Sequence, residues 1–324
     1  MTNVFKRSLR KIHDWAVSLP VLGLLVVLLE QGAYDFISWN YLRQFFFDHL
    51  QDDALADPGV LDLVSVAFNN ESVIDAQIKL IKKYLTGPYR LTVADNSPDP
   101  KKRILIKAVC DGAGVGYISM PANPFSGRFG NWSHGLALNW VFKHYIFPRG
   151  ANYFGFLDHD LFPVRSTAVI PILKKYSLAG AVHRRGDIWY LWPGCCFFRT
   201  ELFRNKKFNF SSRVFLRGVS LTATDTGGGN WPFIYSRLSE RDCCAFSHTL
   251  AFFNEQYPRG PMFEQLGALA DAEKKYDTSK LGSSDKLVEF LGDWLHIRRM
   301  GYGGSKELNA KLNVIVSHYL QDLS

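Results

Sequence analysis

LDLVSVAFNNESVIDAQIKLIKKYLTGP, residues 61–88, is a strand pattern followed by a helix pattern. Leu61 to Phe68 are nearly all apolar, which is typical of a strand buried on both faces of a parallel sheet. Ser72 and Asp75 resemble a capping box at the start of a helix, and Gly87-Pro88 ends that helix. Between these signals, apolar residues recur at helical spacing at Ile74, Ile78, Ile81 and Leu85.

The same alternation continues along the chain. It predicts a second strand around Leu91 and Val93, a helix over 100–110, a third strand over 115–120, a helix over 131–147 and a fourth strand over 153–157. Strands that alternate with helices predict an α/β fold with a doubly wound, mostly parallel sheet and helices on both faces. Ligands of such sheets bind beyond the carboxyl ends of the strands. The polar residues at those ends are Asn69, Asn70, Glu71, Asp95, Asn96, Asp158 and Asp160.

The motif LDHDL (157–161) places two carboxylates directly after the fourth predicted strand. Side chains two residues apart point to the same side if the chain stays extended. Two like charges in one small space are costly unless a cation or a proton lies between them, and oxygen ligands suit a hard divalent ion. We therefore expect Asp158 and Asp160 to bind Mn²⁺ or Mg²⁺. The alternative is an exposed turn with two solvated carboxylates.

At this point the sequence resembles the family 2-like glycosyltransferases of the GT-A fold. The resemblance rests on VSVAFNNES (64–72), YRLTVADNSPD (89–99), SGRFGNWSHGLALN (126–139) and FLDHDLFP (156–163). It implies that Phe68, Asn69 and Asp95 hold the base and ribose of a nucleotide-sugar donor. It also implies that Asp158 and Asp160 hold a divalent ion on the donor diphosphate. The sequence lacks the usual Pro-x-Tyr-Asn after the first strand, so the base is left open.

The second half of the chain matches the family more loosely. In TDTGGGNW (224–231), Asp225 stands where the family usually has its catalytic acidic residue, although the usual Glu-Asp pair is absent. Transfer to a hydroxyl needs a general base, which is the role implied for Asp225; the alternative is a turn residue beside glycines. His296 fits the late histidine that reaches the metal or the diphosphate in many of these enzymes. Arg298 and Arg299 follow it as candidate phosphate contacts.

Two further segments have both a functional and a structural interpretation. Trp189, Tyr190 and Trp192 begin the segment IWYLWPGCCFFR (188–199), where they either stack on an acceptor sugar or pack in the core. His134 opens the helix before the fourth strand. That helix start either binds an anion or is simply capped by Asn131 or Ser133, and we expect the cap.

These expectations describe a metal-dependent, hexosyltransferase-like enzyme. It would move a sugar from a nucleoside diphosphate donor to a hydroxyl of a glycan or glycolipid, with inversion. One alternative is another phosphate-handling, metal-dependent transferase such as a nucleotidyltransferase. The first loop, FNNES (68–72), disfavours it because it contains neither Gly nor Lys. The other is a non-catalytic sugar-binding or membrane-associated protein.

The composition of the chain excludes several other classes of protein and of partner. With 47% hydrophobic and 21% charged residues, the chain is not disordered, collagenous or coiled-coil. Its net charge of +8 suits a phosphate-bearing partner or an anionic membrane, or is only a solvated basic surface. A nucleic-acid partner is not expected, since no RNA-binding signature, zinc-finger spacing or basic zipper is visible. Five cysteines without a CxxC pair indicate reduced thiols in the cytoplasm rather than a disulfide framework or a zinc site.

The N-terminal segment has two interpretations. Four basic residues precede a 14-residue apolar run from Ala16 to Leu29, which is shorter than the roughly 20 residues that a membrane-spanning helix needs. Residues 1–50 either touch the cytoplasmic face of a membrane as a peripheral anchor or fold as a helical hairpin on the main domain. QDDALADPG (51–59) is the expected linker. We therefore expect an N-terminal helical segment and linker over 1–57, a glycosyltransferase domain over 58–304 and a C-terminal helix over 305–324.

Overall fold

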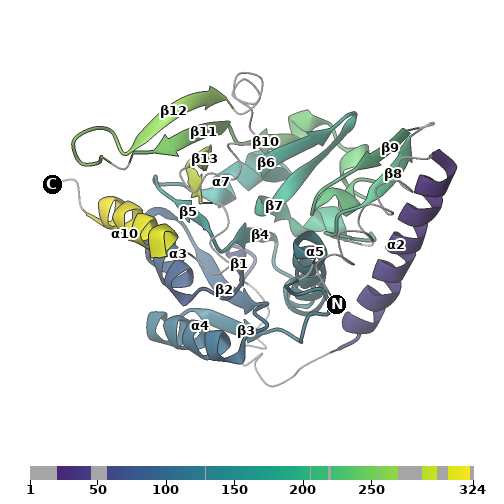
Figure 1. Cartoon of the computed structure of the whole chain (residues 1–324), viewed down its shortest axis with the longest axis horizontal. Helices are drawn as coiled ribbons and strands as arrows, with labels where there is room; N and C mark the ends of the chain where they lie inside the picture. Colours follow the sequence, from purple (N-terminus) through teal and green to yellow (C-terminus); the bar gives the residue numbers. More distant parts are fainter. Residues whose placement is uncertain are drawn as a thin grey trace, which may run out of the picture.

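A computed structural model of the chain describes residues 20–44, 57–127, 129–204, 206–217, 220–254, 256–268, 287–297 and 306–321. Its centre is a seven-stranded sheet in the order β10-β6-β7-β4-β1-β2-β3 (Figure 1). The strands of this sheet are β1 (Leu61–Ala67), β2 (Tyr89–Asp95), β3 (Gly116–Ser119), β4 (Tyr153–Asp158), β6 (Leu178–Arg185), β7 (Ile188–Arg199) and β10 (Cys243–Ala245).

The pairing of these strands confirms a doubly wound, mostly parallel sheet. β1 is parallel to β2 on one side and to β4 on the other, and β2 is parallel to β3. The chain therefore winds outward from β1 in one direction and then returns to its other side. β7 runs antiparallel to both β4 and β6, and β10 is parallel to β6.

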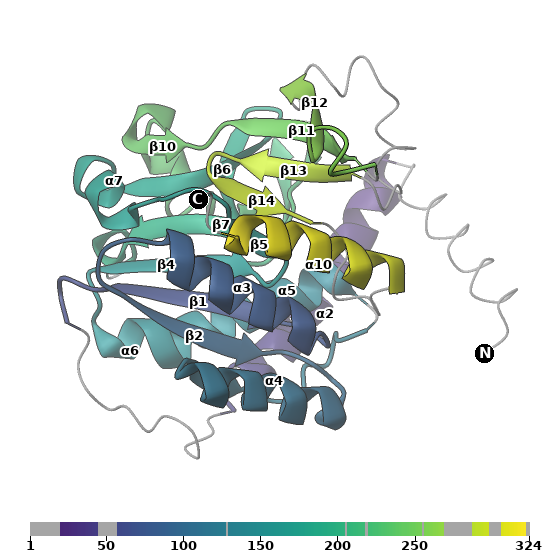
Figure 2. The same cartoon turned by 90° about the vertical axis from the view of Figure 1, so that its left-hand side faces the viewer.

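Helices cover both faces of the sheet, as predicted. The helices are α2 (Pro20–Tyr41), α3 (Glu71–Tyr84), α4 (Pro100–Ala113), α5 (Gly130–Val141), α6 (Phe147–Arg149), α7 (Val169–Lys175) and α10 (Lys306–Leu320). Alternate side chains of β1 point to opposite faces, so Leu63 packs with α3 and α4 while Val64 packs with α5. Figure 2 shows α3 and α4 in front of the sheet and α5 behind it. The continuous apolar pattern of β1 arises because both of its faces are covered.

The helix ends correct two details of the prediction. α3 is capped by Asn70, whose side chain accepts a hydrogen bond from the backbone N–H of Val73. The predicted capping box of Ser72 and Asp75 is wrong, because the helix begins one residue before Ser72. The helix predicted over 131–147 is also divided: α5 ends at Val141, a π-helix runs over Phe142–Ile146, and α6 follows.

A second, antiparallel sheet lies beside the first and has the order β12-β11-β13-β14-β5. Its strands are β5 (Leu161–Pro163), β11 (His248–Phe253), β12 (Phe263–Ala268), β13 (Leu287–Leu291) and β14 (Trp294–His296). β4 of the first sheet leads directly into β5 of the second, so the chain crosses between the sheets at residues 158–161. The LDHDL motif is that crossing.

The remaining short elements lie mainly between β7 and β11. β8 (Val214–Arg217) and β9 (Ser220–Ala223) form a separate hairpin. Short 3₁₀ turns cover Thr200–Phe203, Gly228–Asn230, Tyr235–Arg237 and Glu240–Asp242. At the end of the described chain, α10 packs its Leu312 and Ile315 into a cluster with Val73 and Leu80 of α3.

Within the described part of the N-terminal region, Pro20–Tyr41 form one helix, α2, without the turn that the hairpin alternative places between two helices. The polar residues from Glu30 to Asp35 do not interrupt it, and the helix continues to Tyr41. Tyr34 and Tyr41 are buried in the same core cluster as the apolar residues of α5. Among the described residues, no helix is long and apolar enough to cross a membrane. Residues 1–19 and 45–56, which include most of the predicted linker over 51–59, lie outside the described residues.

Candidate functional site

Three predicted ligand residues meet at the crossing between the two sheets. Asp158 ends β4, Asp160 lies in the turn before β5, and His296 ends β14. β14 pairs with β5, and the N–H of Ile297 donates to the carbonyl oxygen of Asp160 at 3.0 Å. One ligand atom from each of the three side chains lies within 4.8 Å of the other two. Asp160 and His296 are buried, and Asp158 is half-buried.

The charges of this cluster balance within the chain. His296 Nε2 lies 3.5 Å from Asp160 Oδ1. Burial by itself lowers the pKa of His296, but the carboxylates of Asp160 and Glu289 outweigh it and raise the pKa to about 10. Burial likewise opposes ionisation of Asp160, but the facing His296 lowers the pKa of this carboxyl below its ordinary value. A proton on His296 therefore compensates the charge of Asp160 in the protein alone.

This donor set fits a divalent metal ion. Carboxylate oxygens suit Mg²⁺ and Mn²⁺, and an imidazole nitrogen is a transition-metal ligand, so the mixed set favours Mn²⁺ of the two. A ligating imidazole must be neutral, so a bound ion would take the place of the proton on His296. Asp158, Asp160 and His296 would be the ligands.

Gln77 of α3 fixes the backbone of the crossing. This fully buried side chain donates from Nε2 to the carbonyl oxygens of Asp158 and Leu161, both at 2.7 Å. Its own oxygen accepts a hydrogen bond from Ser65 Oγ on β1 at 2.5 Å. The turn that carries Asp160 is thus held by a side chain from the neighbouring helix rather than by its own backbone alone.

Glu289 of β13 orients His296, and the sequence analysis missed it. Glu289 Oε2 lies 3.1 Å from His296 Nδ1 and 3.4 Å from His248 Nε2, and the side chain is buried. A carboxylate on Nδ1 keeps the proton there and directs Nε2 toward Asp160, which is the usual arrangement behind a metal-ligating histidine. The available signal was an acidic residue within the otherwise apolar strand LVEFL (287–291).

His134 also joins the site. Its Nε2 lies 3.0 Å from Asp158 Oδ1, so this residue near the start of α5 reaches the end of β4. The expected cap by Asn131 or Ser133 is wrong: α5 begins after Phe129 and has no side-chain cap. Ser133 Oγ instead accepts a hydrogen bond from Asn96 Nδ2 at 3.1 Å.

The residues expected to hold a nucleotide lie at the ends of β1 and β2, but they differ in burial and in hydrogen bonding. Asn69 adopts a left-handed backbone conformation (φ 54°), and its buried Oδ1 has no hydrogen-bond partner among the described residues. Such strain and an unmet acceptor are both typical of binding sites. Phe68 is half-buried beside it. Asp95 is fully buried, and its carboxylate accepts hydrogen bonds from the N–H of Ser97 and the hydroxyl of Tyr117, each at 2.9 Å.

Asp225 is connected to the metal-ligand cluster through two rings. Asp225 is half-buried after β9 and lies close enough to His183 to oppose the lowering of that residue's pKa, which burial brings to about 4. The His183 ring stacks on Trp192, with centroids 6.0 Å apart. The Trp192 ring centroid is in turn 4.9 Å from that of His296. The ring contacts thus link His183 to His296 through Trp192.

The three aromatic residues expected to bind the acceptor are not equivalent. Tyr190 has no exposed surface, and its hydroxyl accepts a hydrogen bond from the N–H of Asp225 at 2.8 Å. Trp189 is also buried in the core. A ring with no accessible face cannot stack on a sugar, so the burial does not fit that role for Trp189 and Tyr190. Trp192 is half-buried, so it remains a candidate for stacking on the acceptor sugar. Arg298 and Arg299 lie outside the described residues.

No protein-family model matches the chain, and no curated protein matches its sequence. Solved structures match it over about half of its length. A galactosyltransferase, LgtC, in complex with donor and acceptor sugar analogues is 15% identical over 45% of this chain and 60% of that chain, with a TM-score of 0.34. A mannosyltransferase from Pyrobaculum calidifontis in complex with GDP-mannose and Mn²⁺ is 14% identical over 59% of this chain and 58% of that chain, with a TM-score of 0.34.

A third match is the glucosyl-3-phosphoglycerate synthase of Mycobacterium tuberculosis in complex with Mn²⁺, UDP and glucosyl-3-phosphoglycerate. It is 18% identical over 44% of this chain and 57% of that chain, with a TM-score of 0.29. The chain thus spans less than two thirds of the length of each of these structures.

Proposed function

We propose that the protein is a metal-dependent glycosyltransferase that uses a nucleoside diphosphate sugar as donor. The observation that carries the proposal is the convergence of Asp158, Asp160 and His296 at the carboxyl end of β4, beside the central strand of a doubly wound sheet. That edge is where ligands of such sheets bind. A divalent ion held there would supply the positive charge that a departing diphosphate needs.

The donor nucleotide is assigned to the ends of β1 and β2, with Phe68, Asn69 and Asp158 as its proposed contacts and Asp95 as a residue that positions Asn69. Asn69 has the strongest support because its side-chain oxygen is buried without a partner. Asp95 acts by holding Ser97, whose hydroxyl accepts a hydrogen bond from the N–H of Asn69 at 2.7 Å. Asp95 is closed to solvent, and its carboxyl thus supports the backbone of Asn69 through Ser97.

The proposed reaction is a single displacement at the anomeric carbon. The acceptor oxygen forms a bond to that carbon while the bond to the diphosphate oxygen breaks, so the configuration inverts. Asp225 takes the proton of the acceptor hydroxyl. Trp192, half-buried and in contact with His183 and His296, is the proposed sugar platform, and the acceptor is a glycan or glycolipid.

Thermal unfolding in the presence of UDP or GDP, each with and without Mn²⁺, tests the proposal. At about 100 times the dissociation constant, a ligand that binds only the folded state adds about 2.7 kcal/mol to the free energy of unfolding. We expect a higher Tm only when Mn²⁺ and one of the nucleotides are both present, and no such rise in Asp158→Asn. A nucleotide effect that persists in EDTA, or that Asp158→Asn retains, would contradict the metal role. Release of UDP or GDP from nucleotide sugars then separates an enzyme from a sugar-binding protein.

We also infer a cytoplasmic location for this enzyme. The support is that all five cysteines are free, and four of them are buried. Burial raises the pKa of Cys110 and Cys243 to about 12, so these thiols stay protonated and unreactive at neutral pH.

A further inference from the structure

The side of α2 that faces away from the protein is apolar. Leu29 is 74% exposed and Phe36 is 67% exposed, and Leu25, Leu28 and Trp39 are each more than half exposed. They are separated by three, four or seven residues (25 to 28 and 29, 29 to 36, 36 to 39), which aligns them along one stripe of the helix, opposite the buried Tyr34 and Tyr41. A surface helix of a globular protein ordinarily has polar residues on that side. The stripe therefore lacks an apolar partner in the described chain.

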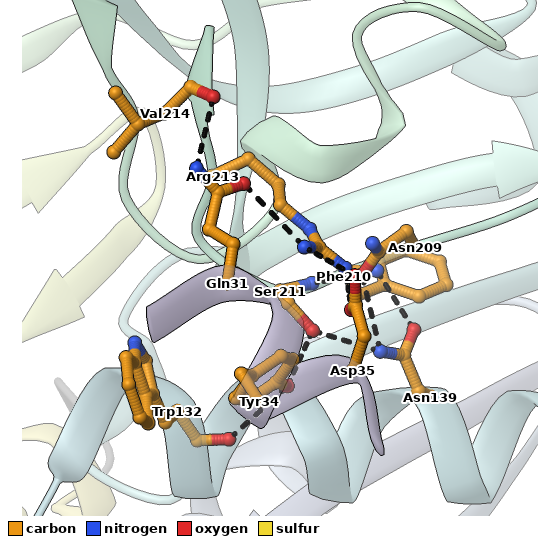
Figure 3. Close-up of polar contacts among 10 residues, drawn as sticks. All are labelled: Gln31, Tyr34, Asp35, Trp132, Asn139, Asn209, Phe210, Ser211, Arg213 and Val214. Atoms are coloured by element: carbon orange, nitrogen blue, oxygen red, sulfur yellow. Dashed lines mark hydrogen bonds and ion pairs between the residues drawn. The ribbon is translucent and has the colours of Figure 1, made fainter. Parts of the chain in front are cut away.

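Polar contacts fix α2 so that this stripe stays outside (Figure 3). The hydroxyl of Tyr34 lies 2.5 Å from Ser211 Oγ, which also accepts a hydrogen bond from Asn139 Nδ2 of α5 at 3.0 Å. Asp35 forms an ion pair with Arg213, at the start of the β8–β9 hairpin. Because these contacts are specific, α2 cannot turn about its axis to bury the stripe without breaking them.

The β8–β9 hairpin extends the apolar surface. Gln31 of α2 donates to the carbonyl oxygen of Val214, and β8 and β9 lie beside one end of α2 in Figure 1. Leu216 and Leu221 are paired across the hairpin, and both are exposed. We call the set Leu25, Leu28, Leu29, Phe36, Trp39, Leu216 and Leu221 the outer face.

Two arginines contact tryptophan rings at or beside the outer face, and one of them, Arg217, also pairs with Asp187. The Arg43 guanidinium lies 4.5 Å from the centre of the Trp39 ring, and that of Arg217 lies 4.8 Å from the Trp231 ring. Before α2, residues 1–19 contain Lys6, Arg7, Arg10 and Lys11 against one acidic residue, Asp14. Apolar side chains flanked by arginine, tryptophan and a basic segment fit a bilayer with anionic headgroups.

We propose that the outer face binds the surface of an anionic lipid bilayer, with the axis of α2 parallel to the membrane plane. The same hairpin leads into the proposed general base. The N–H of Thr224 donates to the carbonyl oxygen of Arg213 at 2.7 Å, and Asp225 is the next residue. If the proposed function holds, on which this step rests, the acceptor is a glycan carried on a lipid and presented at the bilayer surface beside Asp225.

Cosedimentation of the full chain with vesicles tests the proposal, without nucleotide or metal. One set contains phosphatidylglycerol and phosphatidylethanolamine, and the other contains phosphatidylcholine alone. We expect binding to the anionic set that weakens with added salt. Leu29→Glu/Phe36→Glu should lower the partition coefficient roughly 100-fold. Leu216→Glu/Leu221→Glu, on a separate element, should also lower it.

The matched control is Ile104→Glu/Leu105→Glu on α4, where both residues are exposed and apolar but lie away from α2 (Figure 1). This variant should bind vesicles as the natural sequence does. Absence of binding by the natural sequence, or an equal loss in the control, would overturn the proposal. So would a dimer in sedimentation equilibrium that Leu29→Glu/Phe36→Glu dissociates. The Mn²⁺-dependent nucleotide effect on Tm is measured without lipid, so its failure counts only against the proposed function.

Discussion

The end of β4 and the outer face of α2 reverse the usual distribution of side chains in opposite ways. At the end of β4, charged groups are buried; on α2, leucine, phenylalanine and tryptophan are exposed. The buried charges are compensated inside the chain by the proton on His296, because an uncompensated buried charge is very costly. The exposed apolar groups do not need such compensation, because each adds only a modest free-energy cost when it is in contact with water. A single substitution in the first region should therefore have a large effect, whereas a single substitution on the outer stripe of α2 should change the stability of the fold only slightly.

The largest expected effect belongs to Asp160→Asn. Removing one carboxylate ligand should lower the transfer rate on the order of 10³-fold, which corresponds to about 4 kcal/mol of transition-state stabilisation. Initial rates with a nucleotide sugar at saturating Mn²⁺ measure this, and circular dichroism shows whether the fold is retained. Full turnover of the variant in chelator-treated buffer would contradict the role of the metal.

Glu289→Gln should have a smaller effect because it acts through His296. Loss of the carboxylate on Nδ1 is expected to weaken Mn²⁺ binding about 10- to 100-fold. High Mn²⁺ should restore most of the rate, which a general loss of structure would not allow. Glu264→Gln, an exposed change on β12, is the matched control and should leave the Mn²⁺ dependence unchanged.

Tyr34→Phe tests the polar contacts that hold α2. Removing the hydroxyl leaves Ser211 and its neighbours with one fewer partner, at a cost of about 1–2 kcal/mol in the free energy of unfolding. Denaturation in urea measures it. Vesicle binding should survive, because the outer stripe is untouched. If the stability is unchanged, the helix is not held by this network.

Trp39→Ala should have the smallest effect on folding. Its ring is exposed, so the free energy of unfolding should change by less than about 0.5 kcal/mol. The same substitution should measurably weaken vesicle binding. A large loss of stability would mean that Trp39 packs against protein and would contradict the difference between the two regions.

The first half of the main sheet could be predicted because its signals are local. β1 and β4 are continuous apolar runs, and the two carboxylates of the cluster are neighbours in the chain, so their meeting follows from the fold class. His296 was placed through the family resemblance, and the structure does bring it to the two aspartates.

The rest depends on contacts between distant segments. Neither Glu289 nor His134 lies in a motif that identifies its partner: Glu289 faces His296 from the neighbouring strand β13, and His134 reaches Asp158 from α5. Trp189 and Trp192 look alike in sequence, yet one is buried in the core and the other is half-buried beside His296. The length of α2 was missed because Asp35, which looks like a break in an apolar run, is paired with Arg213.

The crossing between the two sheets has a mechanical consequence. Asp158 belongs to the seven-stranded sheet and His296 to the five-stranded one, with more than a hundred residues of chain between them. An ion that holds both side chains is a cross-link across that long loop. Amide hydrogen exchange in β13 and β14 should slow on loading with Mn²⁺, while exchange in β2 and β3, which the link does not reach, stays the same.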